Sequence, residues 1–172
     1  MRTLCRHSLP ARRRWHGAVV LELLITLPLL VIGSMAAVEM GLWMTGCERV
    51  EMAARVGADE AATGSNLDEA VAKVTTYLST VGADVNHLHV LVIRNQTGAL
   101  EDALTQRSPH SDAWEDWEPL LAQLPPPPES PYVRVVVRIR SDALAPNLLT
   151  HFGFALSEQW TVRVKTLPYE GT

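Results

Sequence analysis

The chain has 172 residues, of which 47% are hydrophobic, with two cysteines and a formal net charge of −4. This length allows one membrane segment and one small domain, and two cysteines exclude both a disulfide framework and a cysteine-rich metal site. Residues 1–17 hold five arginines and no acid, and the rest carries a formal charge of −9, so the basic cluster lies in the leader and a nucleic-acid partner is excluded.

The basic leader, residues 1–17, precedes an apolar run over residues 18–46 that only Glu22 and Glu39 interrupt. A run of this length is more than enough to cross a hydrocarbon core of about 30 Å as a helix. Short basic flanks stay on the cytoplasmic side, so we expect a cytoplasmic N-terminus and a periplasmic remainder, a single pass in a bacterial inner membrane. Glu39 is then expected near the outer boundary, close to Trp43 as an interfacial anchor.

The acid at position 22 needs an explanation, because a carboxylate inside a membrane segment is costly and usually has a partner. Cleavage after Gly17 would supply one, since it would free a cationic amine on Ala18. That amine would lie one helical turn from Glu22. The spacing predicts a processing site at Gly17 and Ala18 and a role in assembly for Glu22.

Small residues recur every four positions along the apolar run, at Gly33, Ala37, Gly41 and Thr45. Such a ridge lets a second helix approach closely and predicts lateral helix packing. The alternative interpretation is compositional, because glycine and alanine are common in membrane helices. Residues 47–63 lack proline and are rich in helix formers, so we expect the helix to continue outside the membrane.

Residues 64–172 are expected to form a small domain of α+β class. Asn66 resembles the start of a capping box, apolar residues follow at helical spacing through residue 81, and Gly82 suits the end of a helix. Residues 112–124 are expected to contain one or two helical turns, and residues 141–157 a segment that dips into the core.

Three segments have strand character: residues 87–94, 132–140 and 159–166. Alternation in the last two predicts an antiparallel sheet with one face in water. The residues expected to face the core are Val133, Val135, Val137, Ile139, Trp160, Val162 and Val164, whereas Arg134, Arg138 and Arg140 are expected to point into solvent.

Residue types that serve in catalysis or metal binding are present but sparse. His87 and His89 share one face of an expected strand without an evident third ligand, and His110, Ser111 and Asp112 are adjacent in sequence rather than arranged as a triad. Trp114 and Trp117 could form an adhesive patch or a packing edge, and Asn95 begins a sequon. We predict no enzyme, no cofactor and no metal.

The processing motif extends into a wider pattern. It comprises Gly17 followed by Ala-Val-Val-Leu-Glu, then Leu-Pro-Leu-Leu at 27–30, Val-Glu-Met-Gly at 38–41 and Ala-Ala-Arg-Val-Gly-Ala-Asp-Glu-Ala-Ala at 53–62. This pattern resembles the TadE-like family of minor pseudopilins from tight-adherence (Tad, or Flp) pilus systems. The resemblance covers residues 12–62 well and the closing strands loosely. Leu23 departs from the Phe or Tyr that many members carry.

The resemblance implies cleavage by a prepilin peptidase between Gly17 and Ala18, and lateral packing with other pilin subunits through the N-terminal helix. It also implies the Tad assembly machinery and membrane lipid as partners, and incorporation into a type IV pilus. Two classes of function stay open: a minor pseudopilin, or a single-pass anchored or secreted envelope protein with a binding role. Secretion would use a small-residue cleavage site at residues 34–36, and a lipoprotein would use Cys47.

Overall fold

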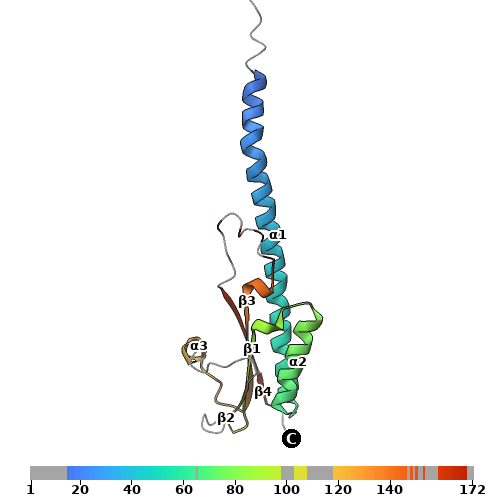
Figure 1. Ribbon diagram of the computed structural model, residues 1–172. Helices are drawn as coiled ribbons and strands as arrows, with labels where there is room; N and C mark the ends of the chain where they lie inside the picture. The colour runs from blue at the N-terminus through green and yellow to red at the C-terminus, as the bar shows by residue number, and fades with distance from the viewer. Residues whose placement is uncertain are drawn as a thin grey trace, which may run out of the picture.

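The computed structural model of the chain describes residues 15–64, 66–97, 103–107, 118–146 and 159–169, together with residues 148, 150 and 153. A long helix runs into a small domain made of a second helix and a four-stranded antiparallel sheet (Figure 1). The predicted α+β fold is confirmed. The long helix and the second helix lie on one face of the sheet, and the long helix extends far beyond it.

Helix α1, Trp15–Ala62, is continuous over 48 residues, which confirms that it runs on past the apolar segment. Pro28 lies inside it, where its missing N–H removes one backbone hydrogen bond. The helix ends where the chain turns at Gly64, whose φ of 86° favours glycine.

Helix α2, Leu67–Thr80, has the ends that the sequence predicts. The Asn66 side chain accepts a hydrogen bond from the Asp68 N–H at 3.3 Å and so caps the first turn. At the other end Gly82 adopts a φ of 80°, and the Ala83 N–H bonds to the carbonyl of Leu78 at 3.0 Å. This closure satisfies a carbonyl that would otherwise lack a partner in the last turn.

Four strands form the sheet in the order β2-β1-β3-β4, all antiparallel. Their bounds are Leu88–Asn95 for β1, Ala103–Arg107 for β2, Tyr132–Arg140 for β3 and Trp160–Pro168 for β4. Strand β2 is an addition to the three predicted strands. It is short and forms one edge of the sheet.

The main core lies between the sheet and the two helices. Alternate residues of β3 reach it as predicted, and α1 supplies a row of small side chains. The closest approach is at Gly57, where a Cβ atom would lie 2.4 Å from Val74 Cγ2 of α2 and 3.5 Å from Val135 Cγ1 of β3. The buried residues of this core from α1 and β3 are Val50, Ala53, Ala54, Ala58, Ala61, Ala62, Val133, Val135, Val137 and Ile139.

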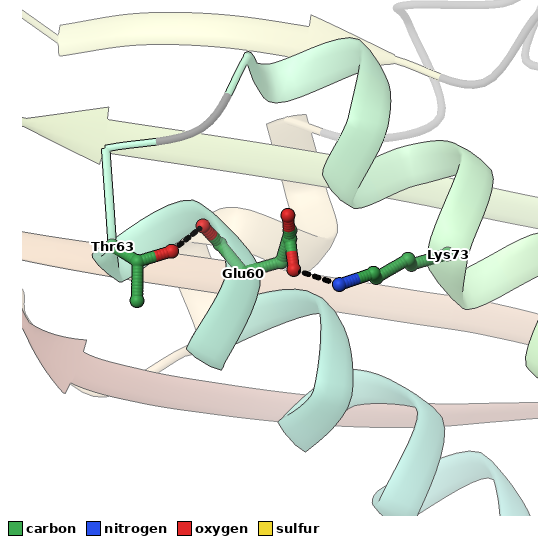
Figure 2. A network of polar contacts seen from close by, with 3 residues as sticks. All are labelled: Glu60, Thr63 and Lys73. Carbon is green, nitrogen blue, oxygen red and sulfur yellow. Dashed lines mark hydrogen bonds and ion pairs between the residues drawn. The ribbon is translucent and has the colours of Figure 1, made fainter.

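A small polar network joins the end of α1 to α2 (Figure 2). The ammonium of Lys73 donates to the carboxylate of Glu60, and the hydroxyl of Thr63 donates to the Glu60 carbonyl at 2.8 Å. Because the Lys73 side chain is 56% exposed, the ion pair contributes little to stability. Its effect is to orient the turn between the helices.

The second face of the sheet is not uniformly in water, contrary to the prediction. Leu91 and Val136 are fully buried there beneath side chains of the segment that carries α3, Glu118–Gln123. Strand β4 contributes Val162 and Val164 to this outer cluster because its register pairs Val164 with Val136. The prediction that Trp160, Val162 and Val164 face the helices is therefore wrong, since all three lie on the opposite face.

The prediction for Arg134 is also wrong. It was expected in solvent, but only 6% of it is exposed. Its guanidinium donates to the Thr166 hydroxyl at 3.1 Å and to the Pro126 carbonyl at 3.4 Å. The proline-rich segment after α3 therefore covers this part of the outer face.

Candidate functional site

The N-terminal part of α1 projects from the domain and is largely exposed. Over residues 19–38 no side chain is buried; Ile32, Met35 and Ala36 are half-buried, and the other large apolar side chains are 42% to 72% exposed, the extremes being Val31 and Leu30. Within the described residues, α1 is the one helix long and apolar enough to cross a membrane. In a folded monomer, such an apolar surface marks a contact with lipid or with another chain.

The length of this exposed segment matches the bilayer. A helix of twenty residues is about 30 Å long, close to the thickness of a hydrocarbon core. Burial by the rest of the chain begins at Glu39 and becomes regular from Gly46. Leu42 and Met44 are still 43% and 52% exposed beyond Glu39, so the exposed apolar side chains continue close to residue 46, where the predicted segment ends.

The hydroxyl groups within residues 19–45 are satisfied by the helix itself. Thr26 donates to the carbonyl of Glu22 at 2.9 Å, Ser34 to that of Val31 at 2.8 Å, and Thr45 to that of Gly41 at 3.0 Å. A hydroxyl that bonds to its own helix needs no water. The segment can thus enter lipid without stranding these groups.

Gly17 and Ala18 lie in the first turns of α1, and Glu22 lies four residues after Ala18 on the same helix. Residues four apart are neighbours on a helix surface, so the structure brings Ala18 and Glu22 together on one face. Glu22 itself is exposed.

Gly33, Ala37 and Gly41 form an open ridge on the exposed part of α1. All three are exposed, and a Cβ atom on Gly33 or Gly41 would have nothing within 4 Å. Further along, Gly46 and Gly57 are in close contact with the chain's own domain. The first three small residues are therefore available to another helix, whereas the later ones are already used.

Glu39 is covered by the chain itself, since only 2% of it is exposed. Its position near the membrane boundary stays a prediction. Trp43, one turn later, is half-buried, and among the described residues its indole N–H has no hydrogen-bond partner. The chain therefore covers α1 already at Glu39, inside the apolar run.

The predicted histidine pair is not on one strand face, so that prediction is wrong. His87 is exposed in a 3-10 helix, Val85–His87, whereas His89 is in β1 with its ring 5.3 Å from that of Trp160. Among the described residues no group of three or more His, Cys, Asp or Glu could hold a metal ion. Cys47 is a buried free thiol on α1.

Asn95 is fully buried at the end of β1, where its side chain accepts from the Thr97 N–H at 3.1 Å. A glycan needs an exposed asparagine, so Asn95 stabilises the turn after β1 and is not a glycan acceptor. The stretch from His110 to Asp112, Trp114 and Trp117 lie outside the described residues.

The sequence pattern does not predict one cluster of side chains, which joins β1, β3 and β4. Arg138 lies over the ring of Trp160, with its Cζ atom 4.2 Å from the ring centroid, and His89 packs on the same ring. Cross-strand register brings these three residues together from β3, β4 and β1. Only the strand order could have revealed this, because the three residues lie far apart in the sequence.

No protein-family model, curated protein or solved structure matches the chain. The candidate functional site is therefore the exposed segment of α1, with Gly17, Ala18 and Glu22 at one end and the small-residue ridge at its centre.

Proposed function

We propose that the chain is a minor pseudopilin of a tight-adherence type pilus, anchored by one pass through the bacterial inner membrane. The observation that carries the proposal is the exposed apolar helix, which has no buried residue over residues 19–38 and holds its one acid four residues from Ala18. Such a helix serves both as an anchor in lipid and as a packing surface in a filament.

The proposed order of events follows from the charge. The precursor inserts with its arginine-rich leader in the cytoplasm, and a prepilin peptidase cuts after Gly17. The new ammonium on Ala18 then pairs with Glu22 of the same or a neighbouring subunit. In a site shielded from water, this pair offsets part of the desolvation of the acid and fixes the axial position of the subunit.

Lateral packing completes the proposed mechanism. The ridge of Gly33, Ala37 and Gly41 lets the helix of another pilin subunit approach closely. The Tad assembly machinery would bring such helices together in the membrane. Because the ridge is uncovered in the single chain, no part of the domain has to move before packing.

N-terminal sequencing of the mature protein from membranes tests the proposal. We expect Ala18 as the first residue. Ala37 would instead show a secreted envelope protein, and Met1 an uncut single-pass anchor with a binding role. Either result would overturn the pseudopilin proposal.

A substitution at the processing site gives a second test. Gly17→Val should block cleavage, because a branched side chain replaces glycine beside the scissile bond, and the precursor should accumulate on a gel with its leader attached. Gly33→Val, in the same helix, is the control and should be processed normally. A Gly17→Val protein that migrates with the processed wild type would remove the cleavage claim.

A further inference from the structure

A row of charged side chains lies on α1 beyond the apolar segment. Glu51, Arg55 and Asp59 follow one another at intervals of four residues, and all three are exposed. None of the three takes part in an ion pair with another residue that the structure describes. We name Glu51, Arg55 and Asp59 the charged row. The chain itself leaves this acid–base–acid pattern uncompensated.

The charged row lies on the same side of α1 as the small-residue ridge. Successive residues of a helix turn by about 100°, so Arg55 points within roughly 40° of the direction of Gly41. Gly46 and Gly57 point roughly to the opposite side, where side chains of the domain would lie within 3 Å of an added Cβ atom. The domain therefore occupies one side of α1, while the ridge and the charged row occupy the other.

Two copies of α1 that met through this side without an axial shift would repel each other. Both copies enter the membrane in the same direction, so their helices are parallel. In a parallel two-fold dimer each residue lies opposite its own copy. Arg55 would then face Arg55, and Glu51 would face Glu51. Because like charges placed opposite each other are costly, the charged row disfavours an unshifted pair.

A shift of four residues, about 6 Å along the helix axis, turns these repulsions into attractions. Glu51 of one copy then faces Arg55 of the next, and Arg55 of the first faces Asp59. The ridge accepts the same shift, because its small residues also recur every four positions. Ala18 of one copy comes opposite Glu22 of the next, the two residues that cleavage would turn into an ion pair. A crossing angle of about 20°, common in helix packing, keeps two helices close over this length.

We infer that the charged row is a recognition surface for a second copy of this chain, which packs parallel to the first with a shift of four residues. The inference rests on the part of the proposed function in which α1 spans the membrane, and not on cleavage. The contact leaves Asp59 of the first copy and Glu51 of the second for further copies. It is therefore of the open type, which no two-fold axis closes.

Cysteine cross-linking between full-length copies in membranes tests the inference. Two tagged forms of the chain, in which alanine replaces Cys5 and Cys47, are expressed together, one with Glu48→Cys and the other with Met52→Cys. Both positions are exposed beside the charged row, and they face each other at a shift of four residues. We expect oxidation to join position 48 to position 52 severalfold more than either position to itself, because a disulfide needs Cα atoms within about 7 Å.

Charge variants test the pairs themselves. Arg55→Glu should lower the cross-link between positions 48 and 52 about fivefold, the scale of an exposed ion pair. Reversal of the whole row, with Glu51→Arg, Arg55→Glu and Asp59→Arg together, should restore the cross-link between two such copies. It should not restore the cross-link between such a copy and one with the native row, because like charges then face each other.

Arg49→Glu is the matched control, since it makes the same change of charge at another exposed position of α1. Arg49 points about 120° away from Arg55, and its side chain donates to the carbonyl of Val81 at 3.1 Å. This variant should keep the wild-type yield of cross-link. Equal losses in Arg49→Glu and Arg55→Glu would overturn the inference.

The remaining outcomes separate the inference from the proposed function. Cross-linking mainly between equal positions would show an unshifted pair, and no cross-link between copies would assign this side of α1 to another chain; either result overturns the inference alone. A chain that still begins at Met1 but joins positions 48 and 52 supports the inference and overturns the proposed cleavage. A chain absent from the membrane fraction overturns both the proposed span and the inference.

Discussion

The glycines of α1 fall into two groups according to what surrounds them. At Gly46 and Gly57 another part of the chain lies within 3 Å of the place a Cβ atom would take, whereas Gly33 and Gly41 face open space. In the sequence all four belong to one continuous helix. Only the packing of the domain separates those that shape the core from those left for a partner.

Gly57→Ala should destabilise the domain, because the added methyl group would meet Val74 Cγ2 at 2.4 Å. Overpacking of this kind costs about 1–3 kcal/mol. Thermal unfolding in detergent micelles, followed by circular dichroism, measures the change. Gly33→Ala is the control and should unfold at the wild-type temperature; a Gly57→Ala protein as stable as the control would contradict the close packing.

Glu22→Leu should leave membrane insertion intact but impair pilus assembly, because the Ala18 ammonium would lose its acid. Removing one partner of a buried ion pair costs about 3–5 kcal/mol. Insertion is measured by membrane fractionation and assembly by counting pili in electron micrographs. Glu48→Leu, which changes an exposed acid of α1 outside the apolar segment, should assemble normally, and normal pili in both variants would exclude the role of Glu22.

At the scale of elements, a long apolar run followed by helix formers made α1 predictable, and periodicity made α2 and β3 predictable. Strand β2 was missed because Ala103–Arg107 is short and largely polar, as edge strands often are. The alternation correctly predicts that β4 has two different faces, but the prediction assigns each face to the wrong side of the sheet. Alternation separates two faces without saying which one meets the helices, and that is decided by the register of Val164 with Val136.

The α3 segment supports the sheet by covering its outer cluster. Leu121→Ser should therefore destabilise the domain by about 1–2 kcal/mol, less than the 2–5 kcal/mol of a fully buried leucine, because Leu121 is only half-buried. Chemical denaturation gives the free energy of unfolding. Gln123→Ser, at an exposed position of the same helix, should change it little; equal stability of Leu121→Ser and wild type would show that α3 does not stabilise β3.

At the scale of the whole molecule, the boundary predicted between residues 63 and 64 falls inside one core. α1 contributes Val50, Ala54 and Ala58 to the same cluster as α2 and the sheet. The site was only partly predictable for the same reason. Hydropathy located the apolar segment and its acid, but the burial of Glu39 and the contacts of Arg138 and His89 with Trp160 depend on residues far apart in sequence.

A fragment of residues 64–172 should therefore fail to fold, because it lacks the α1 side chains that close the core. A fragment of residues 39–172 should fold, since it keeps every residue of α1 that the structure describes as buried. Dispersion of amide resonances in NMR spectra distinguishes the two. A well-dispersed spectrum from the shorter fragment would show that the domain does not need α1.

The uninterrupted passage of α1 from its exposed segment into the core has a rotational consequence. Successive residues of a helix are turned by about 100° around its axis, and no loop between residue 19 and residue 62 can absorb a twist. A subunit that enters a filament one residue out of step would turn its whole sheet by that angle. The azimuth of each domain around a filament is thereby set by the axial register of its helix.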